Sequence, residues 1–363
     1  MDDFRPRWAS APGESIQTAL LERDWDLSRF AAEVHLDENA AAGLLDGSAD
    51  MTVAVARELA QALGGSSRFW LSREARYRES LEWVHADRWV SLLPANEMAS
   101  LGWIDAPKDW FGRIAAFMDF FGVESPLQMT AEHTQIADAK FRSTPTEPKH
   151  EATVAAWVRQ VELESEVVTC SPWDRNAFAA VLPQAAALSR QADPRDFLPS
   201  LKQLAASTGV VVVVVRAPTG CPVSGVSITL ESGRRVIGLS ARYRSDDHFW
   251  FTFLHEAAHI VLHEGVGMYI DDIERDGSPG SEGPEAEADQ FASEMLLPSE
   301  LLEKLPNRIT PVTIHGLANR ASVSPGVVLG QLQHAGLVSY RSKMNRLKHR
   351  YSWDGPVLSR QSA

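Results

Sequence analysis

An apolar segment that contains five ionisable side chains constrains the fold of this chain more than any other feature. Residues 249–264 have the sequence FWFTFLHEAAHIVLHE. Five large apolar side chains directly precede its first histidine: Phe249, Trp250, Phe251, Phe253 and Leu254. We therefore predict a long helix from Phe249 to about His263 that lies deep in a core. Unpaired buried polar groups are costly, so the histidines and the glutamate of this helix need partners.

The two histidines of the HEAAH motif (residues 255–259) are spaced for a shared metal ion. His255 and His259 are four residues apart, so their side chains lie on one face of a helix. Glu256 is rotated away from that line and can activate a water molecule beside the metal. Two neutral imidazoles and one carboxylate suit zinc and leave the open position that catalysis requires. The alternative is a chance match to a short motif, but an ion would provide the partners that this apolar setting demands.

A third ligand is expected from the helix that follows. Glu285 begins the segment EAEADQFASEMLLP, 26 residues after His259. Asp289 lies one helical turn later on the same face and is suited to orient a ligating histidine from behind. His263 is the rival ligand, but it lies roughly 5 Å further along the first helix, so we favour Glu285. Glu287 is two residues from Glu285 and is interpreted as solvated.

Strands first appear after residue 209. Runs of β-branched and apolar residues predict strands at Val210–Val215, Val226–Leu230 and Val236–Leu239. Together with the two helices they indicate an α+β fold with a small sheet. The strand from Cys221 to Ile228 is either an edge that accepts an extended peptide or an ordinary sheet strand. Cys221 is either a thiolate that occupies the open zinc position or a small buried cysteine.

Two polar side chains just before the metal-binding helix are further candidates. In the segment LSARYRSDDHFW, Arg242 and Tyr243 are placed to donate to the oxyanion that forms at an attacked peptide. For Arg242 we favour the alternative, a structural ion pair with Asp246 or Asp247. Tyr243 remains a candidate catalytic residue.

The chain has 363 residues, which is too long for one ordinary domain. Residues 1–80 indicate four or five short helices with short turns, as in an all-α helix-turn-helix bundle. Residues 81–195 indicate a helical connecting region, interrupted by the linker-like sequence STPTEPKH at 143–150. Residues 196–350 contain the strands and both metal-binding helices, and residues 351–363 are expected to be a C-terminal tail.

Charge and cysteine content narrow the functional classes. The formal net charge is −13, and the two cysteines, Cys170 and Cys221, are far apart. The negative charge disfavours nonspecific nucleic-acid binding by the whole surface, and the cysteines do not suggest a disulfide framework. No apolar run has membrane-spanning length, and the first residues lack a signal-peptide pattern. We therefore expect a cytoplasmic protein.

Three further segments each allow two interpretations. The acidic, glycine-rich loop 271–284 is either a mobile lid or a surface excursion. Residues 313–336 resemble a helix-turn-helix, but packing helices that complete the catalytic domain explain them equally. The basic cluster at 341–350 either contacts nucleic acid or an acidic partner, or is a solvated tail.

At the metal-binding motifs the chain resembles the ImmA/IrrE family of metallo-endopeptidases. That family pairs an HExxH helix with a downstream E-x-E-A-[DN]-x-F-A helix that ends in L-[LM]-P, and here the two are HEAAH and EAEADQFASEMLLP. The resemblance implies a zincin-like α+β peptidase domain. It also implies that His255, His259 and Glu285 are zinc ligands and that Glu256 is the catalytic base.

The resemblance extends to the N-terminal part. The segments PGESIQTALLERDWDLSRFAAEVHLDENAAAGLLDG and VARELAQALGGSSRFWLSREARY are similar to the Xre-type helix-turn-helix of HigA-like antitoxins. Proteins that join such a segment to an ImmA/IrrE domain resemble this chain over most of its length. In ImmA/IrrE peptidases the substrate is a partner repressor of Xre type, so the resemblance implies a repressor or antitoxin-like regulator as the substrate.

The expected recognition helix at residues 37–45 departs from that pattern. Five acids and no Lys or Arg lie between Glu33 and Asp50, and the first 80 residues have 14 acids against 9 arginines, a net charge of −5. Because phosphate contacts dominate DNA affinity, we expect dimerisation or protein docking there rather than DNA binding. Two alternatives to the peptidase remain: a HigA-like DNA-binding repressor that uses the peptidase fold for sensing, and a scaffold whose zinc is structural.

Overall fold

The computed structural model describes residues 7–128, 148–230, 232–263, 265, 267–272, 283–303, 305–306 and 308–361. The chain divides into two compact units, Met1–Leu92 with Asp105–Glu132 and Leu93–Ile104 with His133–Ala363. No helix in the described ranges has the length and apolar character needed to cross a lipid bilayer. Most of the loop expected at 271–284, residues 273–282, lies outside the described residues.

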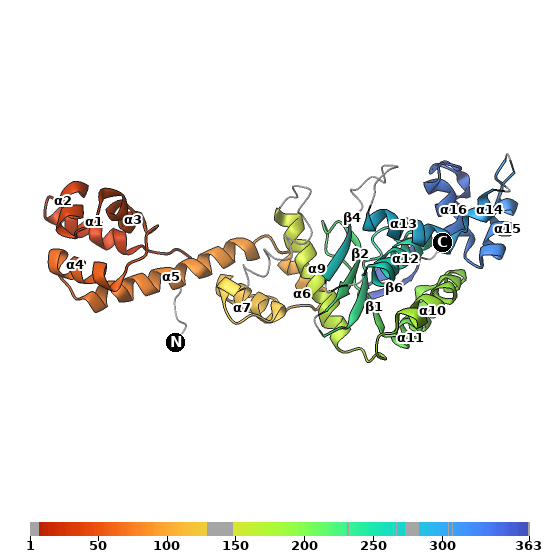
Figure 1. Cartoon of the computed structure of the whole chain (residues 1–363), viewed down its shortest axis with the longest axis horizontal. Helices are drawn as coiled ribbons and strands as arrows, with labels where there is room; N and C mark the ends of the chain where they lie inside the picture. The colour runs from red at the N-terminus through yellow and green to blue at the C-terminus, as the bar shows by residue number, and fades with distance from the viewer. Residues whose placement is uncertain are drawn as a thin grey trace. The chain divides into compact units, whose positions relative to one another are not determined.

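Every secondary-structure element in the described part of the first unit is a helix. Its helices are α1 (Pro12–Glu22), α2 (Leu27–Glu33), α3 (Glu38–Asp46), α4 (Val53–Leu63), α5 (Ser67–Val90) and α7 (Trp110–Phe121) (Figure 1). The side chains of Asp26, Asp37 and Thr52 accept backbone N–H groups and so cap α2, α3 and α4. Gly47 ends α3 in the left-handed conformation (φ 78°), which suits glycine. One apolar core holds the first four helices and the start of α5 together.

The short helices predicted in the first 64 residues are present, and the helix predicted after Thr52 begins at Val53. However, α5 continues from Ser67 to Val90. The domain boundary expected at residue 80 therefore falls inside a helix. The expected connecting region, 81–195, is also divided between the two units.

The second unit is built on a mixed four-stranded sheet. Its strands are β1 (Val210–Val214), β2 (Val223–Thr229), β3 (Arg235–Leu239) and β4 (Gly267–Asp272), in the order β1-β3-β2-β4. β1 is parallel to β3, whereas β2 is antiparallel to both of its neighbours, β3 and β4. β1 and β4 are therefore the edges. The α+β class predicted for this part is confirmed.

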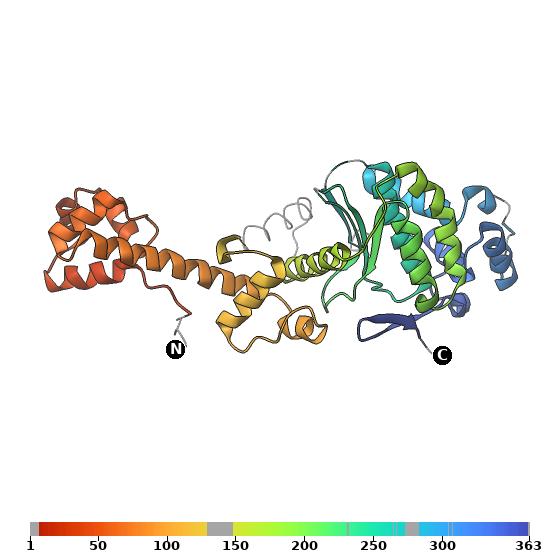
Figure 2. The ribbon, with the colours of Figure 1, turned by 90° about the horizontal axis from the view of Figure 1, so that it is seen from below.

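Both faces of the sheet are buried. Val210 and Val212 of β1 pack with α10 (Arg175–Ala187), α11 (Pro194–Ala206) and α12 (Asp246–Leu262), whereas Val211 and Val213 pack against α9 (Pro148–Glu166). Figures 1 and 2 show these two sets of helices on opposite faces. This explains why β1 is an unbroken run of valines: each alternate residue of a strand faces one layer, and here both layers are apolar.

Further elements complete the core around α12. They are η1 (Leu188–Arg190), α13 (Pro284–Leu296), α14 (Ser299–Leu302), α15 (Pro311–Ala321), α16 (Pro325–His334) and η2 (Lys343–Leu347). The short helix α6 (Ala95–Ser100) also belongs to this unit. Apolar residues of α15 and α16, such as Ile314 and Val327, lie in the same core as α12. Residues 313–336 therefore pack as part of this unit, which favours the packing interpretation over a separate helix-turn-helix.

The C-terminal residues form a hairpin rather than a tail. β5 (Tyr351–Asp354) pairs with β6 (Val357–Arg360) in an antiparallel ribbon. Tyr351 and Leu358 are 1% and 3% exposed and belong to the main core. The tail expected at 351–363 is thus wrong for residues 351–360. The short strands were not recognised because polar residues and Gly355 separate their few apolar positions.

Candidate metal centre

The metal-binding helix predicted from the apolar segment is α12, and it is almost wholly buried. The exposed fractions of His255, Glu256 and His259 are 3%, 0% and 2%. One side of α12 packs on β2 and β3, and the other packs against α13. These contacts place three ionisable side chains where water cannot solvate them, so their polar atoms require partners within the fold.

Three ligand atoms converge between α12 and α13. The Nε2 atoms of His255 and His259 are 3.1 Å apart. Glu285 Oε2 lies 3.4 Å from the first and 3.8 Å from the second. Zinc–ligand bonds of about 2.0–2.1 Å in a tetrahedron separate neighbouring ligand atoms by roughly 3.3 Å. The spacing of the group His255, His259 and Glu285 therefore fits a zinc-sized ion.

The outer nitrogen of His255 explains why a cation suits this group. Its Nδ1 lies 2.9 Å from Asp289 Oδ1. A carboxylate accepts, so Nδ1 carries the hydrogen and Nε2 presents its lone pair. That lone pair faces His259 Nε2 and the carboxylate of Glu285. Such a concentration of acceptor atoms is unfavourable unless a cation lies between them.

The charges of His259 and Glu285 agree with metal binding. Burial lowers the pKa of His259 below its ordinary value, against the effect of Glu285, and this favours a neutral imidazole. Burial alone would raise the pKa of Glu285, but the neighbouring His255 and His259 outweigh this effect and hold the pKa well below its usual range. A neutral His259 and an anionic Glu285, together with Nε2 of His255, provide the nitrogen and oxygen donors that many zinc enzymes use.

Glu256 lies on the side of α12 that faces the sheet. Both of its carboxylate oxygens are buried. A Cβ atom at Gly225 of β2 would lie 2.6 Å from Glu256 Oε1 and 2.6 Å from Thr252 Cγ2. The absence of a side chain at Gly225 thus allows β2 to approach α12 beside Glu256. Sequence reasoning did not identify this glycine, because its role depends on how the strand and the helix pack.

His263 and Glu287 have roles that the sequence did not show. His263 Nδ1 lies 3.0 Å from His259 Nδ1, on the side of that ring opposite the converging Nε2 atom. Its Nε2 lies 2.9 Å from Glu287 Oε2. His263 is therefore placed behind His259 rather than among the three ligand atoms. Glu287, interpreted from the sequence as merely solvated, has a specific partner.

A family model matches the part of the chain that holds these residues. Residues 210–333 match the peptidase family M78, described as the IrrE N-terminal-like domain. The match covers 124 of the 363 residues, from β1 to α16. It supports the resemblance of this IrrE-like region to ImmA/IrrE-type metallopeptidases. No curated protein matches the chain.

Arg242 and Tyr243 lie a few residues before the N-terminus of α12, within the IrrE-like region (residues 210–333). The ring of Tyr243 stacks on His248 with centroids 4.4 Å apart, and the Arg242 guanidinium lies 5.6 Å from the Tyr243 ring. Arg242 also donates to the carbonyl oxygen of Pro222. The ion pair favoured for Arg242 is wrong, because Asp246 and Asp247 bond to other groups. A catalytic role for Tyr243 stays a prediction.

The two expectations for the strand near Cys221 are resolved by the sheet order. β2 lies between β3 and β4, so it is an ordinary internal strand, and the edge interpretation is wrong. Cys221 is 5% exposed and lies in the valine-rich core between the sheet and α9. This position favours a small buried cysteine over a thiolate that occupies the metal site.

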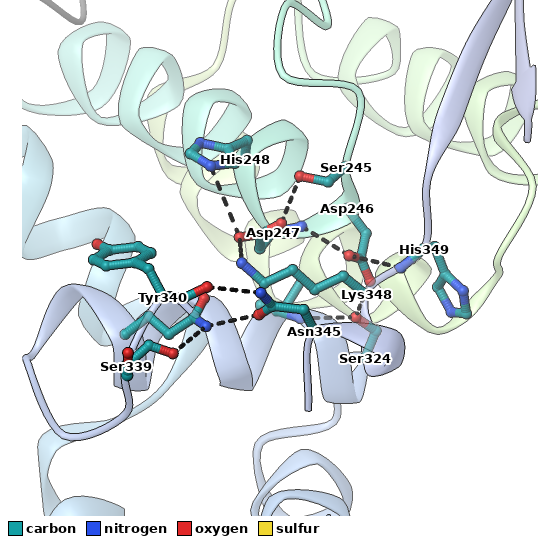
Figure 3. Close-up of polar contacts among 12 residues, drawn as sticks. Ser245, Asp246, Asp247, His248, Ser324, Ser339, Tyr340, Asn345, Lys348 and His349 are labelled. Atoms are coloured by element: carbon teal, nitrogen blue, oxygen red, sulfur yellow. Dashed lines mark hydrogen bonds and ion pairs between the residues drawn. The ribbon is translucent and has the colours of Figure 1, made fainter. Parts of the chain in front are cut away.

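A buried polar network holds the N-terminus of α12 (Figure 3). Asp246 accepts the hydroxyl of Ser324 (2.7 Å) and the backbone N–H of His349 (3.0 Å). Asp247 is paired with Lys348, and both side chains are 7% exposed. At least one member of the basic cluster at 341–350 is therefore structural, and it lies beyond the IrrE-like region.

Proposed function

We propose that this protein is a zinc-dependent endopeptidase of ImmA/IrrE type. The observation that carries the proposal is the convergence of His255, His259 and Glu285 beside the buried Glu256, within a region that matches a metallopeptidase family. The HExxH arrangement, with a carboxylate ligand from a later helix, corresponds to a zincin-like domain. Three protein ligands of these types would suit a catalytic zinc ion, whereas structural zinc sites generally use four.

Each residue of the centre has a distinct role in this mechanism. His255, His259 and Glu285 would hold the zinc ion, and Asp289 orients His255 through its Nδ1–H. When bound, zinc supplies Lewis-acid activation of the scissile carbonyl and of water. Glu256 accepts the proton of the attacking water and later delivers it to the leaving amine. Its burial keeps this proton transfer away from bulk solvent.

The topology also supports an extended peptide as the substrate. β4 is an edge of the sheet, and its Tyr269 stacks on His259 with ring centroids 4.3 Å apart. A peptide that adds to this edge would run beside the metal centre and gain main-chain hydrogen bonds. By resemblance, the substrate is an Xre-type repressor or an antitoxin-like regulator in the cytoplasm, cleaved in a stress or defence response.

The Glu256→Gln variant tests the proposal. The zinc-loaded full chain is incubated with a library of unstructured peptides and with any Xre-type repressor encoded beside it, and cleavage products are identified by mass spectrometry. We expect cleavage by the wild type and by the exposed control Glu300→Gln. Glu256→Gln should retain its zinc and lose at least a hundredfold in rate, the scale of general-base catalysis. Cleavage by Glu256→Gln at the wild-type rate would refute the mechanism.

The helical N-terminal unit supports a second candidate, a HigA-like DNA-binding repressor. α2 and α3 follow one another with only four residues between them, as in a helix-turn-helix. However, α3 carries Glu38 and Asp46 and is capped by Asp37, so its charge opposes a phosphate backbone. Dimerisation or docking of a partner protein suits this unit better. A gel shift with the protein's own promoter, lost on changing residues 37–45 and retained in Glu256→Gln, would favour the repressor.

A further inference from the structure

The two imidazoles of the metal centre are held from behind in different ways. His255 Nδ1 meets a carboxylate directly, since Asp289 Oδ1 lies 2.9 Å away. His259 Nδ1 meets another imidazole, because His263 Nδ1 lies 3.0 Å away. His263 in turn meets a carboxylate through its Nε2, which lies 2.9 Å from Glu287 Oε2. Each histidine is thus linked to a carboxylate of α13, His255 directly and His259 through His263. The same helix also provides Glu285.

In the chain of contacts His259–His263–Glu287, the carboxylate of Glu287 determines which nitrogen of each ring carries a hydrogen. Glu287 accepts only, so His263 Nε2 carries a hydrogen and donates it. A neutral His263 then has a lone pair on Nδ1, which accepts the Nδ1–H of His259. His259 is left with its lone pair on Nε2, the atom that faces His255 and Glu285. The opposite neutral tautomer of His259 would place two lone pairs against each other at Nδ1.

We propose that His263 and Glu287 are positioning residues that fix the tautomer of His259 and so present its Nε2 to the metal ion. The proposal deepens the proposed function, because it rests on the same metal site, but it does not require peptide cleavage. Outer partners of this kind orient imidazole ligands and raise their affinity for metals. Here the partner of His259 is His263, whose own tautomer is set by its hydrogen bond to the carboxylate of Glu287, and we call this arrangement the relay.

The contacts of the three rings show that His259 is held in two directions. Tyr269 lies parallel to its face, with a 9° angle between the planes and 4.3 Å between the centroids, while His263 holds its edge. The exposed fraction of the His263 side chain is 11%, against 65% for Glu287. Water competes more strongly for an exposed hydrogen bond, so the His259–His263 contact should contribute more than the His263–Glu287 contact.

Metal affinity provides the first test. Zinc binding to the purified full chain is measured by competition with a chromophoric chelator, with His255→Ala locating the site. We expect His263→Leu to weaken zinc binding by about tenfold, and Glu287→Ala to weaken it less. His263→Gln and Glu287→Gln each retain an acceptor oxygen and should recover most of the affinity. The exposed residues His315 and Glu300 provide the matched controls His315→Gln and Glu300→Ala.

The tautomer of His259 provides the second test, independent of activity. In protein labelled with ¹⁵N-histidine, long-range ¹H–¹⁵N spectra distinguish a protonated Nδ1 from a protonated Nε2, and they are recorded without zinc so that no metal ion fixes the tautomer. We expect His259 to have Nδ1–H in the wild type. In the chain without zinc, His263→Leu and Glu287→Ala should shift it towards a mixture. Because Glu287 is exposed, Glu287→Ala tests the relay even if His263→Leu folds poorly.

The outcomes separate this proposal from the proposed function. Wild-type affinity and an unchanged tautomer in both His263→Leu and Glu287→Ala would overturn the relay. A wild type that binds no zinc at His255 would overturn the relay and the peptidase together. If zinc binds, the variants respond as expected and no peptide is cleaved, the relay stands and the proposed function fails.

Discussion

At Gly225, strand β2 lies so close to Glu256, the proposed catalytic base, that no larger residue fits without displacement. A methyl group at this position would lie 2.6 Å from both Glu256 Oε1 and Thr252 Cγ2, well inside van der Waals contact. We predict that Gly225→Ala destabilises the second unit by about 1–3 kcal/mol, the usual cost of overpacking. We also predict that it displaces Glu256, so that peptide cleavage falls more than zinc affinity.

Denaturant unfolding and zinc titration of Gly225→Ala measure the two effects. Gly267→Ala is the control, because a Cβ atom at that glycine of the neighbouring strand would meet no atom within 4 Å. If Gly225→Ala were as stable and as active as Gly267→Ala, β2 would not be packed tightly against Glu256.

The sequence predicted the members of the centre whose positions follow from helix periodicity. The four-residue spacing of His255 and His259 places them together, and the same spacing relates Glu285 to Asp289. Glu287 follows Glu285 by only two residues, so nothing in its spacing indicated a partner on α12. The stacking of Tyr269 on His259 could not be predicted either, because it depends on the position of β4 in the sheet.

At the scale of elements, α12 begins three residues before the predicted start at Phe249. Its first two residues, Asp246 and Asp247, are buried despite their acidic side chains, with exposed fractions of 0% and 6%. Long-range partners stabilise them there, among them Ser324 and Lys348 (Figure 3). Sequence periodicity carries no information about partners 78 or 101 residues away.

Helix α16 packs closely on this acidic pair. Its glycines make the approach possible, since a Cβ atom at Gly326 would lie 2.4 Å from Asp246 Oδ2, and one at Gly330 would lie 2.5 Å from Asp247 Cβ. The spacing of these two glycines is four residues, so both lie on the face of α16 that covers the N-terminus of α12. The packing of α16 explains why Asp246 is removed from solvent.

Burial of Asp246 predicts a specific pH dependence. The pKa of Asp246 is raised from 3.8 to about 7, mainly by burial. The nearby charge of Asp247 also raises this pKa, whereas the hydrogen bond from Ser324 lowers it. Between pH 4 and 7 the folded protein therefore holds a proton that the unfolded chain has lost. The contribution of this group to the unfolding free energy falls as the pH rises through that window.

The comparison of wild type with Asp246→Asn isolates this effect, because other titrating groups contribute equally to both. We expect the stability of the variant relative to the wild type to increase from pH 4 to 7, by at most about 1.4 kcal/mol per pH unit. Urea unfolding at each pH provides the measurement. A difference that is constant across the range would show that Asp246 titrates normally. Lys348 and His349 face the same network, so their hydrogen bonds should be present in both proteins.

Strand β4 was missed at the same scale for a different reason. Its sequence, GMYIDD, begins with glycine and ends with two acids, so it lacks the β-branched run that revealed β1. This segment forms a strand because it pairs with β2. In that pairing Gly267 lies opposite Thr229 and Asp272 lies opposite Val223. Strands stabilised by their neighbours are those that periodicity detects least well.

At the scale of the whole molecule, the two compact units differ in how well the sequence predicts them. The N-terminal unit has its own core, which includes Ile16, Phe30 and Leu59, and its short helices were predictable from caps and glycines. The second unit contains the sheet and the metal centre, and its class was predictable from the valine-rich strands. The division between the units was not, because α5 crosses residue 80 without a break.

Separate cores predict that zinc stabilises one unit only. A ligand at a hundred times its dissociation constant stabilises the folded state by about 2.7 kcal/mol, and this applies to the unit that contains His255, His259 and Glu285. Removal of zinc by chelation should therefore speed amide hydrogen exchange in α12 and α13, by up to about a hundredfold where exchange requires unfolding of that unit. The amides of α1 to α4 should exchange at an unchanged rate.

Mass spectrometry of peptic fragments resolves the two regions, and His255→Ala should be insensitive to the chelator. Equal acceleration in both regions would show that the cores unfold together, in which case the metal would stabilise the whole chain.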